Sequence, residues 1–354
     1  MRIIIITFLF PVFMLQNCKE KDNSVTLVST HVIEIKKDFL HGDSPELQFE
    51  MLDTINLSAP GNPPITIVQD ISFSDQFFLL LDRKQGILKF DYTGNYLEAI
   101  GECGEGPKEY SMPYAIHLDE EENSLLVADW QKRIVISYDL EGNFNCSSQR
   151  LPGHPISFYK ENDTLLVVQE MLNGTKEKPR QVLVSSIAPK TLEFNNWNSP
   201  LYGYDSRLTI IHSFPRILSR VKNASLFYLP IIRENISSRT KTDTIFRKEE
   251  DHLVPEYLLH FTGFDNTHQL HIRQMVLSDS NAFLLVVYEK RSLFLVIELE
   301  DKPSLVKVRK LFDQELTREI IPRPLKEDLF YSILRNEAGV EERNPRIIFY
   351  RIVN

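Results

Sequence analysis

Aromatic, cationic and amide side chains gather in the stretch Asn195–Arg216, which glycine and proline interrupt. Aromatic rings stack on sugar rings or peptide side chains, and a guanidinium group pairs with carboxylates. A turn nearer the N-terminus adds a second tryptophan and another arginine. The sequence therefore predicts a ligand-binding surface, with packing of the same aromatics as loop anchors as the alternative. Its candidate residues are Trp130, Arg133, Trp197, Tyr202, Tyr204, Arg207 and His212.

Three glycines between Gly101 and Tyr110 superficially match a phosphate-binding loop. Such a loop binds phosphate when a helix N-terminus follows it. Here Pro107 comes directly after the glycines and no helical pattern follows, so we expect a turn between two structural units. Glu109 and Tyr110 then either anchor this turn or face a central channel, and both interpretations stay open.

Histidines and carboxylates offer two candidate sites for a divalent cation. His260, His268 and His271 are the densest histidine set, but no acidic residues accompany them at the spacing of metal ligands. Asp82 and Asp129 end two similar apolar runs, where paired carboxylates could bind calcium or act as acid and base. Turn formation is the favoured interpretation, because an aspartate side chain also accepts hydrogen bonds from nearby backbone. We expect no cofactor, with one calcium or zinc ion as the alternative.

The cysteines are few. The chain has 3, which is too few for a disulfide framework or a four-thiolate zinc site. An exported protein permits a disulfide between Cys103 and Cys146, but these two positions are not equivalent in the repeat described below. Their pairing is left open.

The N-terminus predicts export. Arg2 precedes an apolar run from Ile3 to Leu15, which is shorter than a membrane-spanning helix and typical of a signal peptide. The segment Leu15-Gln16-Asn17-Cys18 resembles a bacterial lipobox, which implies acylation of Cys18 and anchoring to the outer membrane. The charged residues after Cys18 resemble a surface-export signal, so we expect the protein to face outward. The predicted signal peptide is 1–17 and the tether is 18–30.

Length and charge narrow the class of protein. With 354 residues, the chain exceeds the size at which one hydrophobic core stops growing, so we expect two domains or a modular fold. A net charge of −9 argues against a nucleic-acid partner. No other segment is apolar enough to span a membrane, so only the lipid anchor would hold the protein to it.

Short β-type runs recur along the chain, separated by glycine, asparagine, aspartate and proline. They are predicted at 77–81, 87–90, 125–128, 134–138, 165–168, 181–185, 226–229, 283–288, 293–298, 305–308 and 347–353. Helical periodicity is nearly absent. Its one exception is the spacing of Leu325, Leu329 and Ile333, which predicts a short helix.

A repeat joins these runs. Asp82 and Asp129 are 47 positions apart, and Gly94 and Gly142 are 48 apart, each within a strand–turn–strand–turn unit. A period of 40 to 50 residues with several strands is typical of β-propeller blades. Further units begin near 156, 212, 271 and 322, which predicts six blades over 31–354. The last strand, 347–353, is expected to share a blade with a strand near 49–57, because an unclosed ring leaves sheet edges unpaired.

The segment from Gly101 closely resembles a motif of the six-bladed β-propeller lipoproteins of Bacteroidetes, which are related to NHL-repeat propellers. The residues that carry this resemblance are Gly104, Gly106, Pro107, Glu109 and Tyr110. It implies an all-β, six-bladed propeller. The predicted function is an envelope-anchored binding or scaffolding module for a glycan, a peptide or a partner envelope protein, rather than an enzyme. The alternative is an NHL-like, metal-dependent lyase or lactonase with its site in the channel.

Overall fold

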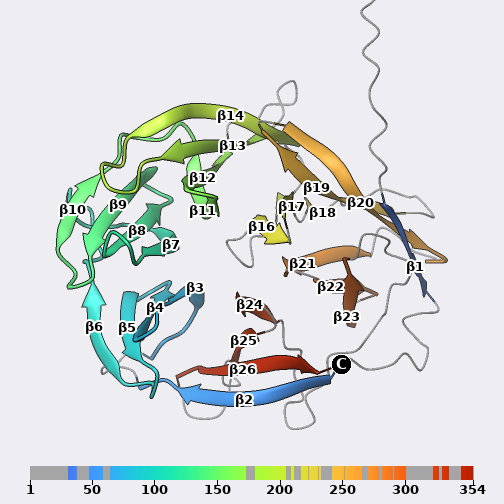
Figure 1. Ribbon diagram of the computed structural model, residues 1–354, viewed down its shortest axis with the longest axis horizontal. Coiled ribbons are helices and arrows are strands. Elements are labelled where there is room, and N and C mark those ends of the chain that lie inside the picture. The colour runs from blue at the N-terminus through green and yellow to red at the C-terminus, as the bar shows by residue number, and fades with distance from the viewer. Residues whose placement is uncertain are drawn as a thin grey trace, which may run out of the picture.

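The computed structural model shows an all-β protein built as a ring of small sheets (Figure 1). The residues described are 31–37, 48–58, 64–172, 180–204, 209–210, 217–221, 223–229, 231–232, 241–250, 252–264, 270–278, 281–289, 291–299, 322–326, 329–334 and 344–353. Six of the sheets form the blades of a six-bladed β-propeller, so the predicted fold class is confirmed.

In the first three blades each sheet follows chain order from the centre of the ring outwards. Blade 1 contains β3 Val68–Phe73, β4 Phe77–Asp82, β5 Gly86–Asp91 and β6 Tyr96–Ile100. Blade 2 contains β7 Pro113–Asp119, β8 Ser124–Asp129, β9 Ile134–Asp139 and β10 Phe144–Ser147. Blade 3 contains β11 His154–Glu161, β12 Thr164–Met171, β13 Arg180–Ile187 and β14 Phe194–Tyr204.

Blades 4 and 6 each include one strand from the N-terminal part of the chain, whereas blade 5 consists of consecutive strands. Blade 4 contains β16 Leu218–Val221, β17 Ala224–Phe227, β19 Lys241–Glu249 and β20 His252–Thr262, with β1 His31–Lys36 outside them. The described strands of blade 5 are β21 His271–Leu277, β22 Asn281–Tyr288 and β23 Arg291–Glu298. Blade 6 contains β24 Arg323–Lys326, β25 Leu329–Leu334 and β26 Arg346–Val353, with β2 Gln48–Asn56 outside them. A separate pair is formed by β15 Thr209–Ile210 and β18 Ile231–Ile232.

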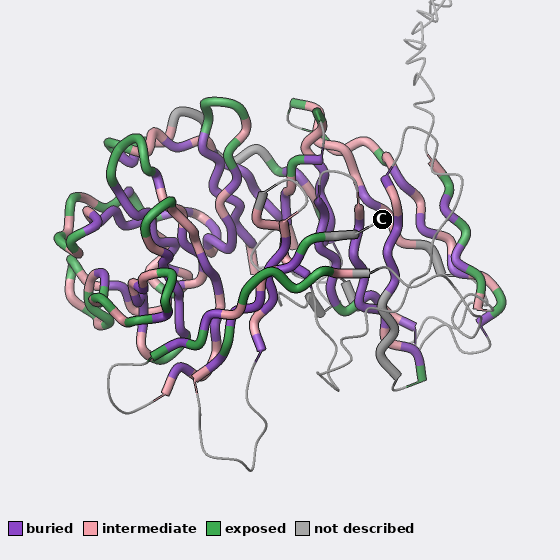
Figure 2. The backbone as a smooth tube through the Cα atoms, turned by 60° about the horizontal axis from the view of Figure 1, so that its bottom comes forward, coloured by how far each residue is buried: buried purple, intermediate pink, exposed green. Residues whose placement is uncertain are grey.

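The core is divided among the six junctions between neighbouring blades. Successive side chains of a strand point to opposite faces of its sheet, so each central strand serves two junctions. In β4, Phe78 and Leu80 pack towards blade 6, whereas Leu79 and Leu81 pack towards blade 2, and all four are fully buried. This double burial explains why the central strands are continuous apolar runs. Buried residues follow the strands and exposed ones gather at turns and outer edges (Figure 2).

The ring closes through the predicted pairing of the chain ends. Strand β2 pairs antiparallel with β26, with Phe49 opposite Ile352 and Ile55 opposite Ile347. Blade 6 is therefore completed by an N-terminal outer strand, as the sequence predicted. The pairing covers the outer edge of β26 from Arg346 to Val353 and ties the two ends of the chain together.

The position of β1 was not predicted. It pairs in parallel with β20, with His31 opposite Tyr257 and Lys36 opposite Thr262. Ile33 and Ile35 are buried in the core between blades 4 and 5, whereas Val32 is 57% exposed. Along the sequence, β1 is therefore an outer strand of blade 4 and β2 is an outer strand of blade 6. The strands of blade 1 follow them.

The short helix predicted from Leu325, Leu329 and Ile333 is wrong, since Leu325 lies in β24 and the other two lie in β25. Residues i and i+4 share a face in a strand as well as in a helix, so the spacing does not separate the two. The other predicted runs lie on strands, although 226–229 extends two residues past the end of β17 and 305–308 lie outside the described residues.

Candidate functional site

The turns of the propeller fall on two faces, because successive antiparallel strands run in opposite directions. In blade 1 the β3–β4 turn at 74–76 and the β5–β6 turn at 92–95 share one side, which we term the hairpin face. The β4–β5 turn at 83–85 and the connection 101–112 to blade 2 lie on the other side, the connection face. The motif Gly101–Tyr110 lies on the connection face, whereas the polar pocket described below opens on the hairpin face.

The glycine-rich segment on the connection face is held in place by Tyr110. This side chain is 1% exposed, and its hydroxyl accepts a hydrogen bond from the Ile87 N–H at 3.1 Å and donates one to the Ile100 carbonyl at 3.1 Å. Burial raises its pKa to about 12. A Cβ on Gly86, which has a φ of +84°, would overlap this hydroxyl. Tyr110 therefore joins the connection to blade 1 and does not face the channel.

The rest of the motif is bonded within itself. The Gly106 N–H donates to the Glu109 carboxylate at 2.7 Å, and the Gly104 N–H donates to the Tyr110 carbonyl at 2.9 Å. Lys132 Nζ donates to the carbonyls of Gly106 and Glu109, both at 2.7 Å. The N–H groups of Gly104 and Gly106 thus already donate within the segment, which supports the interpretation as an inter-blade turn.

The repeated aspartates also accept hydrogen bonds from backbone N–H groups. Asp82 is fully buried, and its carboxylate accepts four backbone hydrogen bonds of 2.9 Å, from Thr66, Ile67, Lys84 and Gln85. In blade 2, Asp129 accepts from the N–H groups of Ser111 at 2.6 Å and Lys132 at 2.8 Å. Each aspartate therefore joins the strand connection entering its blade to the following turn, as expected for turn formation.

Three of the predicted ligand-binding aromatics lie in or against one apolar cluster between blades 3 and 4. Trp130 stacks on His154 with ring centroids 4.2 Å apart, and Tyr202 packs between Phe227 and Phe246. Tyr204 is buried and its hydroxyl donates to the Glu170 carboxylate.

The remaining predicted residues are placed only in part. Arg133 donates to the Pro152 carbonyl at 3.0 Å. Trp197 lies in β14, and the structure describes its backbone only. Cys18, Arg207 and His212 lie outside the described residues. A role of any of these residues in ligand binding or lipidation stays a prediction.

The structure separates the two described histidines of the proposed metal set. His260 lies in the outer strand β20 opposite Glu34, whereas His271 begins the innermost strand of blade 5; His268 is outside the described residues. Within the described ranges, no group of three or more His, Cys, Asp or Glu is close enough to hold a metal ion. Cys103 and Cys146 are both free thiols.

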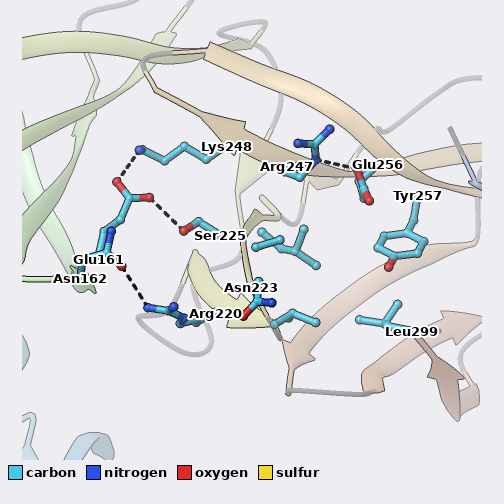
Figure 3. A pocket seen from close by; sticks show the side chains of 13 residues that line it. Glu161, Asn162, Arg220, Asn223, Ser225, Arg247, Lys248, Glu256, Tyr257 and Leu299 are labelled. Carbon is cyan, nitrogen blue, oxygen red and sulfur yellow. Dashed lines mark hydrogen bonds and ion pairs between the residues drawn. The ribbon is translucent and has the colours of Figure 1, made fainter. Parts of the chain in front are cut away.

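A polar pocket of about 490 Å³ opens on the hairpin face at blade 4 (Figure 3). We term it the blade-4 pocket. It is lined by Glu161, Asn162, Arg220, Val221, Asn223, Ala224, Ser225, Leu226, Arg247, Lys248, Glu256, Tyr257 and Leu299. These residues come from the ends of β11, β16, β17, β19 and β20, with Leu299 following β23 of blade 5. Its volume is within the usual range of small-molecule sites.

One end of the pocket is a hydrogen-bonded charge cluster. Lys248, whose side chain is 8% exposed, forms an ion pair with Glu161 at 2.7 Å. The other oxygen of Glu161 accepts from the Ser225 hydroxyl at 2.9 Å, and Ser225 shares a 2.6 Å hydrogen bond with the Tyr159 hydroxyl. The additional hydrogen bonds help to offset the desolvation of this partly buried ion pair and hold the Glu161 carboxylate in place.

The opposite wall combines a second ion pair with an aromatic ring. Arg247 Nε lies 2.9 Å from Glu256, and its other end lies 2.5 Å from Glu249. The hydrogen bond to Glu256 raises the pKa of the Arg247 guanidinium. Tyr257 stacks on His31 of β1 at a centroid distance of 5.5 Å, so the N-terminal strand supports this wall from behind.

Sequence reasoning missed the blade-4 pocket. Its residues come from separate segments between 161 and 299, and they form no motif in the printed sequence. The one available signal is weak: two neighbouring hairpin turns each carry an asparagine, Asn162 and Asn223.

Within the described residues, no helix is long and apolar enough to cross a membrane.

Comparisons with known proteins support the fold and identify the family. A crystal structure of a Bacteroides fragilis protein described as exported superimposes with a TM-score of 0.65 at 16% identity, covering 91% of this chain and 100% of that one. A member of the DUF4221 family from Bacteroides vulgatus gives 0.50 at 9% identity, covering 87% and 99%. At these identities the likeness shows the fold alone, and a fold by itself does not specify a function. No curated protein matches the sequence. The model of the Domain of unknown function (DUF4934) matches residues 65–342, from just before β3 to just before β26, and the protein therefore belongs to the DUF4934 family.

Proposed function

We propose that the protein is an exported binding module that holds a glycan, a peptide or a partner envelope protein at the blade-4 pocket. The observation that carries this proposal is the pocket itself: charged groups from two blades converge on it, and ion pairs fix their geometry. A few polar groups held in fixed positions can orient a small ligand. The related fold of a protein described as exported supports the assignment to the envelope.

The test is a binding screen of glycans and peptides against the full-length protein and one variant that fills the pocket. Asn223 is exposed on the β16–β17 turn, so Asn223→Trp occupies the pocket without removing a core contact. The matched control is Glu141→Trp, on an exposed turn of blade 2 on the same face. Ligands of the pocket should bind the wild type and the control but not Asn223→Trp. Binding that survives Asn223→Trp contradicts the proposal.

We further propose that acylation of Cys18 anchors the module to the outer membrane. The lipobox-like segment supports this, and the tether 18–30 then leads directly to β1. Mass spectrometry of the purified envelope protein should find an acylated N-terminal Cys18. A mature chain that starts elsewhere, or that carries no acyl mass, refutes the anchor and leaves the pocket proposal intact.

A further inference from the structure

The ionic groups of the blade-4 pocket are unequally partnered. Its lining carries three cations, Arg220, Arg247 and Lys248, against the carboxylates Glu161 and Glu256. Lys248 is paired with Glu161, and Arg247 is shared between Glu256 and Glu249. Arg220 is the lining cation that pairs with no carboxylate among the described residues.

Arg220 has most of its hydrogen-bonding capacity available. Its one contact of this kind within the described residues is to the Asn162 side-chain oxygen, at 3.5 Å and therefore weak. A guanidinium has five N–H donors in a planar fork that matches a carboxylate. Burial raises the pKa of Tyr159, which lies beside the pocket, and the positive charge of Arg220 opposes this rise.

Nearby carboxylates do not serve as its partner. Glu161 already accepts from Lys248 and Ser225, and Glu256 lies against Arg247 on the other wall (Figure 3). The charged side chains that line the pocket therefore sum to one positive charge, which attracts an anion.

We propose that the blade-4 pocket recognises an organic carboxylate, held by Arg220, with the uncharged body of the ligand against Tyr257 and Leu299. This inference rests on the proposed function and names the ligand chemistry of the same site. The volume of about 490 Å³ accommodates a ligand of small-molecule size in addition to the carboxylate. An acidic sugar and the free carboxyl end of a peptide both present this chemistry.

The experiment is isothermal titration of the full-length protein, at low salt, with two acids and their neutral counterparts. The pairs are glucuronate with glucose, and N-acetylphenylalanine with its amide. We expect at least one acid to bind, with its neutral partner weaker by about 10- to 100-fold, as for the loss of a charge-assisted hydrogen bond. Which acid binds separates the saccharide source from the peptide source.

Variants assign the preference to one side chain. Arg220→Gln should weaken binding of the acid by a similar factor and abolish its advantage over the neutral partner. Arg150→Gln, an exposed arginine on the connection from blade 2 to blade 3, is the matched control and should bind like the wild type. Added salt should weaken acid binding to the wild type.

The outcomes separate this inference from the proposed function. If a neutral partner binds as tightly as its acid, or if Arg220→Gln retains the preference, the carboxylate site is wrong while a binding pocket stands. If neither acid binds up to about 20 mM, the inference is refuted, and the screen with Asn223→Trp decides the proposed function.

Discussion

Replacing Asp82 by asparagine tests whether the repeated aspartates stabilise the fold by bonding to backbone. In the wild type, each carboxylate oxygen accepts two backbone hydrogen bonds of 2.9 Å, and the side chain is fully buried. An asparagine keeps one such oxygen and turns its NH₂ group towards two N–H donors. Two hydrogen bonds are lost and their donors stay unpaired, which costs about 2 to 4 kcal/mol of unfolding free energy.

The assay is thermal unfolding followed by circular dichroism. A chain of 354 residues has an unfolding entropy of about 0.7 kcal/mol/K, so the expected fall in Tm is about 3 to 5 °C. Asp91→Asn is the matched control, because Asp91 accepts similar turn hydrogen bonds in the same blade but its bonds are exposed. Its Tm should fall less. An Asp82→Asn protein that melts with the wild type, or no earlier than Asp91→Asn, would refute the reasoning.

Three further predictions concern a turn, the N-terminal strand and pH. Gly94→Ala should lower Tm more than Gly142→Ala. Both glycines have a positive φ, which costs an alanine about 1–2 kcal/mol of unfolding free energy. Only the Cβ of an alanine at position 94 would also overlap a backbone carbonyl of β2. Equal melting temperatures would contradict this. Ile35→Ala should lower the unfolding free energy by about 2–5 kcal/mol in a denaturation experiment. Val32, which is 57% exposed, should lose under about 0.5 kcal/mol on replacement by alanine. Equal losses would mean that β1 is not docked in solution. Hydrogen bonds from Thr93 and Asn95 lower the pKa of Asp91 to about 2 from 3.8, so its stabilisation is full above about pH 4 and is lost as the pH falls towards about 2. The Tm difference between wild type and Asp91→Asn should shrink over that window, and a difference that stays constant would show that Asp91 is not the titrating group.

The blades that the sequence predicted most closely are those whose signals are local. Continuous apolar runs, Asp-ended strands and Gly-Asn turns depend on neighbours within a few residues, so the repeat between Asp82 and Asp129 located blades 1 and 2. The closure of β2 on β26 was also predictable, because a blade shared by both chain ends ties the ring together. The spacing of Leu325 and Leu329 misled because helix and strand place i and i+4 on the same face.

By itself, the sequence determined the all-β class, the six repeated units and the pairing of the chain ends. Only the tertiary structure decided that His31 pairs with Tyr257, that Tyr110 anchors the inter-blade connection, and that one pocket is lined by Arg220, Glu161 and Lys248. The physical reason is the sequence separation of the residues that determine each feature. Turns and alternation are set by local backbone preferences. The pairing of β1 and the lining of the pocket depend instead on how distant segments bury surface together once the ring has closed.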